Sequence, residues 1–254
     1  MLKFFRKIRQ NLVSEGITTK YFKYAIGEII LVVIGILIAL QINNWNNAKT
    51  QQKNNLQLSK RLLVETKKNL VELEKEITST EKLISSAFHM LQLIGNDYSD
   101  VNPRLVDSLV FDLLSTPTYN FSTAVLKEAL STGEVASFEN DSLKNLIYSI
   151  PTIMETVKFR ENNIEHDTNN NLIPFLYNNT SLREIDNKFS HWKKLGNSQL
   201  DQIDNRQILS MILWENEIDN LYYIYNTLLR DSYKVVEKNL INLESLLEKE
   251  INTY

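Results

Sequence analysis

The densest group of side chains able to do chemistry lies in residues 160–167, where Arg160, Glu161, Glu165, His166 and Asp167 stand close together. On a helix, Glu161 and Glu165 fall one turn apart, so their carboxylates could hold a cation weakly. His166 or Asp167 would complete such a site. A solvated helix face explains the same charges, and this is the interpretation we favour. We therefore predict no metal site.

A second candidate is aromatic: Tyr222, Tyr223 and Tyr225 follow Trp214 in a helical segment. Such side chains could line a ligand pocket. Aromatic residues at helical spacing belong more often to a hydrophobic core, because each of them buries a large apolar area. The sequence favours the core and leaves the pocket as the alternative.

Catalytic chemistry is limited by what the sequence lacks. It contains no cysteine and therefore no thiol nucleophile or thiolate metal ligand. Its three histidines, His89, His166 and His191, lack the HExxH spacing, and none follows a glutamate by three positions as a di-iron bundle requires. No glycine-rich phosphate loop and no GxSxG elbow occur. We expect no catalytic residue, no cofactor and no enzymatic activity.

The elements that must position these groups begin with residues 25–42 (AIGEIILVVIGILIALQI), named here the apolar span. As a helix it rises about 27 Å, close to the roughly 30 Å of a bilayer hydrocarbon core. A buried helix of a soluble protein would show a polar stripe, and a cleaved signal would end in a small-x-small pair. Because both features are missing, we predict a transmembrane helix over residues 25–45.

The residues before the span favour a cytoplasmic N-terminus. Residues 1–24 hold six basic residues and one acidic residue, whereas the whole chain has a net charge of −3. Basic flanks stay on the cytoplasmic side, and apolar residues at helical spacing among them predict an amphipathic helix on an anionic membrane surface. We predict a basic amphipathic leader over residues 1–24 and no binding of nucleic acid. Its membrane-facing charges are Lys3, Arg6, Lys7 and Arg9.

Three residues of the predicted transmembrane helix define a candidate membrane or partner face. Counting back by sevens from Leu56 reaches Gly35 and Glu28, and a glycine allows another helix to approach closely. Glu28 would then face a partner. The simpler interpretation is a first-turn glutamate that is favoured by the helix dipole and reaches cytoplasmic water. Trp45 suits the outer interface, where its indole would lie among the headgroups.

We predict one all-α domain over residues 46–254, because the whole chain has only six glycines and four prolines, the residues that disfavour helices most. Apolar residues recur every seven positions in a leucine row of Leu56, Leu63, Leu70, Ile77, Ile84 and Leu91. Three positions later runs a more polar companion row of Ser59, Thr66, Leu73, Thr80, Ala87 and Ile94. A free-standing coiled coil prefers both rows apolar, so we favour packing within the chain over an intermolecular coiled coil. We expect an antiparallel helical bundle in which two long helices, one from residue 56 and one over about 201–251, are covered by several short ones.

Short-range signals place the helices between these two. Asn102 and Pro103 should open a helix, Ser122 and Thr123 should cap the next, and Gly133 should end it. Asp141 suits the cap of a helix from Ser142, and Pro151 should start or kink the segment that continues to about residue 177. The polar tract NNTSLREIDN, residues 178–187, predicts a loop.

Two stretches carry a family resemblance. These are GEIILVVIGILIALQINNWN, residues 27–46 behind the leader MLKFFRKIRQ, and LKEALSTGEVASFENDSLKNLIYSI, residues 126–150. With them the chain resembles a family of bacterial single-span membrane proteins of uncharacterised function. The resemblance implies a membrane-anchored helical protein and supplies no catalytic residues.

Two functions remain open. The first is a membrane-anchored helical scaffold or interaction protein of the bacterial cell envelope, partnered by the lipid bilayer and by a second copy or another membrane protein. The alternative is a sensor or regulatory accessory subunit that signals through a continuous transmembrane helix. Both place the chain in the bacterial inner membrane as a single-pass protein with a periplasmic C-terminal domain. A sensor should have a concave polar site of several hundred Å³, whereas a scaffold should expose an apolar patch.

Overall fold

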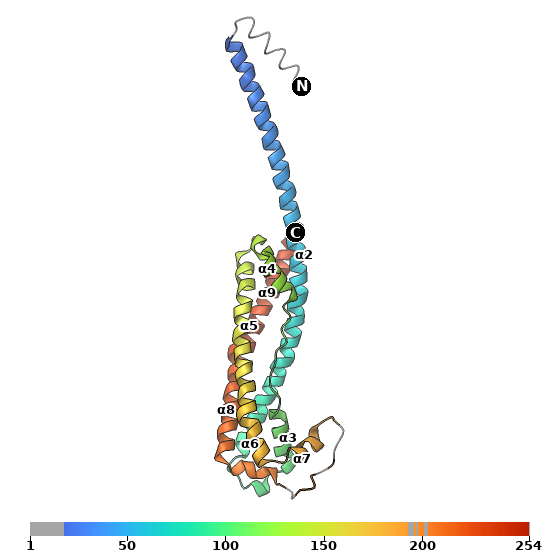
Figure 1. The fold of residues 1–254 in the computed structure, drawn as a ribbon, viewed down its shortest axis with the longest axis vertical. Coiled ribbons are helices and arrows are strands. Elements are labelled where there is room, and N and C mark those ends of the chain that lie inside the picture. The colour runs from blue at the N-terminus through green and yellow to red at the C-terminus, as the bar shows by residue number, and fades with distance from the viewer. Residues whose placement is uncertain (1–17, 193–195, 197, 201–202, 254) are drawn as a thin grey trace. The chain divides into compact units, whose positions relative to one another are not determined.

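The computed structural model describes residues 18–192, 196, 198–200 and 203–253, and all of their regular structure is helical, with no strand (Figure 1). The predicted all-α class is confirmed. The predicted leader charges Lys3, Arg6, Lys7 and Arg9 lie outside the described residues. The chain divides between Asn55 and Leu56 into two units.

The first unit consists of the N-terminal part of helix α2 (Thr18–Leu93). From residue 29 to residue 54 every side chain is exposed, on all faces of the helix. Within the described residues, α2 is the one helix long and apolar enough to cross a membrane, and none of its apolar window is buried. A helix that is apolar all round has no polar face to present to water.

The second unit begins with the rest of α2 and continues through short and long helices. They are the 3₁₀ turn η1 (Tyr98–Asp100), α3 (Pro103–Leu113), α4 (Ala124–Thr132), η2 (Glu134–Ser137), α5 (Asp141–Asp167), the π-helical turn η3 (Thr168–Leu172), α6 (Ile173–Asn179), α7 (Leu182–Phe189), η4 (Asn205–Ser210), α8 (Ile212–Leu228), the π-helical turn η5 (Leu229–Tyr233) and α9 (Lys234–Thr253). Helix α7 lies in the tract that we predicted as a loop, so that prediction is wrong. Its side chain Ile185 is fully buried, and this tertiary contact outweighs the polar local sequence.

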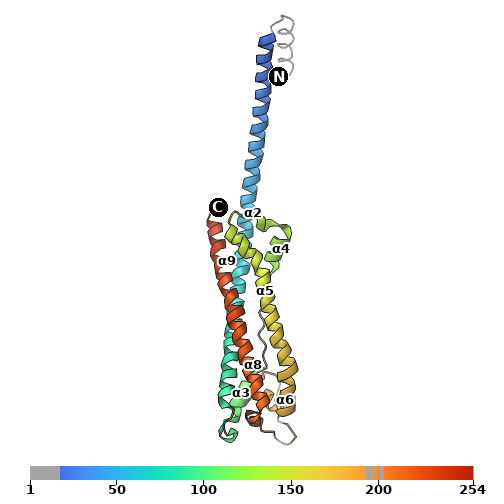
Figure 2. The ribbon, with the colours of Figure 1, turned by 90° about the vertical axis from the view of Figure 1, so that its left-hand side faces the viewer.

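Helix α5 packs against both α8 and α9, and α3 packs against α7 (Figures 1 and 2). Helix α9 also lies beside α2, where Lys67 Nζ reaches Glu248 Oε1 at 2.9 Å and Glu244 Oε1 at 3.3 Å. The enclosed core includes Trp214 and Tyr119 among its largest fully buried side chains. Burial of each such side chain stabilises the fold by about 1.5 to 3 kcal/mol or more.

The companion row of α2 faces this core more fully than the leucine row does. Ser59, Leu73, Thr80 and Ala87 are completely buried, whereas most of the leucine row is only partly buried at the edges of the contact. Small side chains at the centre of a contact let neighbouring segments come close. A buried hydroxyl can also be satisfied within its own helix, as Thr80 Oγ1 is by donating to the Glu76 carbonyl at 2.7 Å.

The irregular segment 114–123, between α3 and α4, runs along α2 (Figure 1) and buries Pro117 and Tyr119. Its backbone N–H groups need partners there, and side chains provide them. Thr118 N donates to Glu76 at 3.3 Å, Tyr119 N to Glu161 at 2.7 Å and Ser122 N to Asn69 at 2.8 Å. The segment is therefore fixed by tertiary contacts.

Helix α4 is capped from α2. Thr123 occupies the predicted N-cap position but makes no side-chain capping bond. Instead, the buried Glu65 carboxylate accepts hydrogen bonds from Val125 N and Leu126 N, both at 3.0 Å. Gly133 ends α4 with a left-handed backbone at φ 75°, as predicted.

Candidate functional site

A cavity of about 300 Å³ lies between α5 and α8 and is named here the α5–α8 cavity. Each helix contributes four residues to its wall. They are Arg160, Asn163, Ile164 and Asp167 from α5 and Asn220, Tyr223, Ile224 and Thr227 from α8. The wall thus combines one guanidinium, one carboxylate, neutral hydrogen-bonding groups and aliphatic surface.

Both helices of this wall leave α-helical geometry beside the cavity. The π-helical turn η3 begins directly after Asp167, and η5 begins directly after α8. Pro174 gives a reason for η3, because proline has no N–H to donate to the carbonyl four residues earlier, at Asn170. Single π turns inside helices occur frequently at functional sites.

Asp167 is the polar centre of the site. Its Oδ1 accepts a hydrogen bond from Asn171 Nδ2 at 2.6 Å, and its Oδ2 accepts one from Asn220 Nδ2 across the helix interface at 3.1 Å. Glu217 of α8 lies beside it. Burial above all, and then the charge of Asp167, raise the pKa of Glu217 to about 7. The Glu217 carboxyl therefore keeps its proton up to near neutral pH.

Arg160 Nε on α5 and the Tyr225 hydroxyl on α8 are buried and have no hydrogen-bond partner among the described residues, and neither Glu217 nor Tyr225 lines the α5–α8 cavity. Tyr225 has no exposed surface at all. Its pKa is raised by burial and then by the charges of Asp167 and Glu217. An unpaired buried polar group costs about 1 to 3 kcal/mol, and a few such groups are normal in a folded protein.

The charged cluster at residues 160–167 is divided by the fold. Glu161 points into the core, where its Oε1 accepts hydrogen bonds from Tyr119 N and the Tyr233 hydroxyl, both at 2.7 Å. Glu165 and His166 are exposed. The alternative cation site on Glu161 and Glu165 is therefore wrong. In the described part of the chain, no group of three or more His, Asp or Glu side chains is placed to hold a metal ion.

The aromatic candidates are divided as well. Trp214 and Tyr225 are fully buried, which confirms the core interpretation for these two. Trp214 stacks on Phe175 with the ring centroids 5.2 Å apart. Tyr222 packs on Phe88 at 5.9 Å, whereas Tyr223 is exposed and lines the α5–α8 cavity. Sequence reasoning did not find the pairing of Asp167 with Glu217, because fifty residues separate them and no local pattern joins them.

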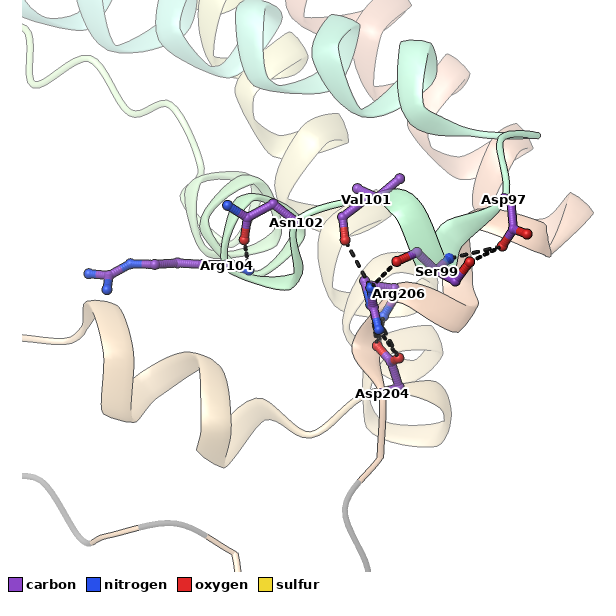
Figure 3. Close-up of polar contacts among 7 residues, drawn as sticks. All are labelled: Asp97, Ser99, Val101, Asn102, Arg104, Asp204 and Arg206. Carbon is purple, nitrogen blue, oxygen red and sulfur yellow. Dashed lines mark hydrogen bonds and ion pairs between the residues drawn. The ribbon is translucent and has the colours of Figure 1, made fainter.

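A second cavity, of about 310 Å³, lies where α3, α7 and η4 meet. Buried Asp107 binds Lys188 Nζ at 2.5 Å and Asn205 Nδ2 at 2.7 Å. Arg206 pairs with the Asp204 carboxylate and donates from Nη1 to the carbonyls of Ser99 and Val101, at 3.0 and 2.9 Å (Figure 3). The charged groups at this second cavity are thus already paired with each other. The hydrogen bonds of Arg206 hold η1 and η4 together.

The three residues of the predicted membrane or partner face lie in the first unit. Gly35 has no heavy atom of another residue within 4 Å of the position a Cβ would take. Trp45 is exposed, and Lys49 Nζ lies 5.5 Å from the centre of its ring. Glu28 is half-buried. Their roles toward lipid or a partner stay predictions.

These features define an all-helical protein with, in the part of the chain described, one helix of a length and composition that could cross a membrane. The chain belongs to a family of unknown function, DUF6090, whose profile matches residues 28–161. The resemblance to a family of unknown function is thereby confirmed. No curated protein and no solved structure matches the chain. The matched region includes Arg160 and ends before Asp167 and α8.

Proposed function

We propose that this protein is a membrane-anchored helical scaffold or interaction protein of the bacterial cell envelope. The observation that supports it best is the apolar span, because none of its apolar window is buried by other residues of the chain. On an insertion scale its Ile, Leu and Val residues favour the bilayer by about 3 to 6 kcal/mol, more than the 2 to 3 that Glu28 costs. In this proposal the span crosses the inner membrane once.

The proposed topology has the basic leader in the cytoplasm and residues 46–254 in the periplasm as an antiparallel bundle. The ion pairs of Lys67 with Glu244 and Glu248 support lengthwise pairing of α2 with α9. The six basic residues of the leader support its cytoplasmic side. The proposed partners are lipid and a second copy or another membrane protein, which the open surface at Gly35 would admit.

Cysteine labelling tests this topology directly, because the chain contains no cysteine of its own. We expect Ser131→Cys, at an exposed position of the second unit, to react with a membrane-impermeant maleimide in spheroplasts. Gln10→Cys in the leader should react only after lysis. The opposite labelling pattern, or recovery of the full-length protein in the aqueous fraction without detergent, would contradict the proposal.

The alternative is a sensor or regulatory accessory subunit, and the α5–α8 cavity favours it. The cavity has the size and the convergent polar groups expected of a ligand site. Purification of the full-length protein in mild detergent separates the two functions. A homo-oligomer without other subunits supports the scaffold, whereas a stoichiometric membrane partner supports the accessory subunit.

A further inference from the structure

We propose that the α5–α8 cavity binds one ring of a neutral sugar, through hydrogen bonds between its hydroxyl groups and the polar wall and through packing of its C–H face on Tyr223 and the aliphatic floor. Sugar binding goes beyond the scaffold function. It involves the second unit alone and is independent of the membrane anchor, so either proposal can fail without the other.

The cavity is a cleft between two antiparallel helices, α5 and α8 (Figure 1). Its floor is aliphatic, since Ile164 is buried and Ile224 half-buried, whereas Asn163 and Tyr223 are exposed at the rim. The volume of about 300 Å³ lies at the lower end of ligand sites. The cleft therefore has polar groups above an apolar floor and room for one small ring.

Several polar groups at the rim are accessible and unpaired. The side chains of Asn163 and Tyr223 form no hydrogen bond with the described residues. The Asn220 amide donates to Asp167, and its carbonyl oxygen accepts no hydrogen bond from the described residues. An amide both donates and accepts hydrogen bonds, as a sugar hydroxyl does. Two amides and one phenol around the rim thus offer matched partners to neighbouring hydroxyl groups.

The apolar part of the wall suits the face of a sugar ring. A pyranose carries its hydroxyl groups around its edge and C–H groups on its faces, and the electron-rich face of an aromatic ring attracts such C–H groups. The Tyr223 side chain is 67% exposed, so its ring has a large area to bury when a ligand binds. Ile164 and Ile224 supply further apolar surface from the two helices.

The charges of the wall favour a neutral ligand over an ion. Arg160 and Asp167 carry opposite charges, so the wall has no net charge with which to attract an anion or a cation. An apolar ligand would take both groups out of water without replacing their hydrogen bonds. A hydroxyl group can accept from the guanidinium or donate to the carboxylate. Asp167 already accepts two hydrogen bonds, and a carboxylate has about four acceptor positions, so it can accept another.

The test is saturation-transfer NMR of the full-length protein in a polyoxyethylene detergent, because maltoside detergents carry sugar headgroups that would compete. The probes are D-glucose, D-galactose, D-mannose and N-acetyl-D-glucosamine. The control is D-glucitol, the open-chain counterpart of glucose, which lacks the ring face and loses more conformational freedom on binding. At least one sugar should bind at millimolar concentration and at least about tenfold more tightly than glucitol.

The methyl glycoside of the sugar that binds distinguishes two sources of the ligand. Retained binding of the glycoside means that the site admits the end of a glycan chain, whereas lost binding restricts the site to a free sugar. Both outcomes support the proposal. These comparisons use the unchanged protein and do not depend on the folding of any variant.

Variants then place the sugar in the cavity. Asn163→Ala and Tyr223→Ala should each weaken binding about three- to tenfold, through the loss of one hydrogen bond or one ring contact. The matched controls are Asn162→Ala and Tyr177→Ala, at exposed positions outside the wall, which should leave binding unchanged. All four positions are exposed, so thermal unfolding should hardly change. No binding of any probe sugar at millimolar concentration, equal binding of glucitol, or binding that is unchanged in both wall variants would overturn the proposal.

Discussion

Helix α2 contains two regions that differ in which of their side chains are buried. Over residues 29–42, its apolar side chains are exposed on every face, and from Leu56 onwards it buries one face that includes serine and threonine. In water the first region has no reason to be apolar all round, whereas the second follows the ordinary rule that a helix buries one stripe. The comparison supports the proposal that the two regions are built for different surroundings, a bilayer and a protein core.

The strongest test of this comparison is to replace a leucine by alanine in each of the two regions. Leu73→Ala removes a completely buried side chain and should lower the free energy of unfolding of the second unit by about 3 to 5 kcal/mol. Leu37→Ala changes a side chain that is exposed in the apolar span and should leave that free energy unchanged. Thermal and urea unfolding of the full-length protein in detergent measure both effects. Equal destabilisation by the two variants would show that the regions share one core.

A second prediction concerns the buried polar groups of the protein-core region. Glu65→Ala removes the carboxylate that caps α4 and leaves Val125 N and Leu126 N without their acceptor. We expect a loss of about 2 kcal/mol in unfolding free energy, the sum of a lost cap and of desolvated donors. The control is Glu81→Ala, at an exposed position of the same helix, which should stay within about 0.5 kcal/mol of the unchanged protein. A similar loss in both variants would contradict the capping role.

Local signals accounted for much of the fold. Asn102 and Pro103 opened α3 as predicted, and Gly133 ended α4, because a cap and a left-handed glycine depend on a few neighbouring residues. The helical class followed in the same way from the scarcity of glycine and proline. Where tertiary contacts decide, the sequence pattern was misleading: α7 forms around buried Ile185 in a tract that looked like a loop, and α4 takes its cap from Glu65.

The candidate site was largely hidden from sequence reasoning for the same physical reason. Arg160 and Asp167 were visible as charged residues of one cluster, but the fold separates them from Glu161, which binds Tyr119 and Tyr233 in the core. The partners of Asp167, which are Glu217 and Asn220, come from another helix. Only the packing of α5 on α8 brings these groups together.

The apolar span offers a matched pair of glycines for a third prediction. Gly35 and Gly27 both have open space around them in the single chain, but about 80° of helical rotation separates them. If Gly35 faces a second span, Gly35→Leu should weaken the oligomer or partner complex about tenfold, or about 1.4 kcal/mol, whereas Gly27→Leu should have little effect. Crosslinking and size analysis in mild detergent measure the difference. Identical behaviour of the two variants would remove Gly35 from the interface.

The smallest effect that we predict comes from the acid pair in the second region. The pKa of Glu217 is about 7 in the folded protein, compared with 4.5 for a glutamate in the unfolded chain. The folded state therefore binds this proton more tightly. As pH rises from about 4.5 through 7, the unfolded chain ionises first and the unfolding free energy falls. Glu217→Gln, which stays neutral, should therefore be more stable than the unchanged protein by about 1 kcal/mol at pH 8, a value reduced for the partial exposure of the side chain.

The same variant should show no such advantage at pH 4, where Glu217 is protonated in both states. Glu215→Gln is the matched control, because Glu215 is exposed on the same helix and should change stability by less than about 0.5 kcal/mol at either pH. Thermal unfolding of the full-length protein in detergent at the two pH values provides the measurement. A gain at pH 8 confined to Glu217→Gln would show that the second region retains a costly acid pair next to its cavity. If the two variants behave alike, the carboxyl pair has no measurable effect on the stability of this region and the prediction is wrong.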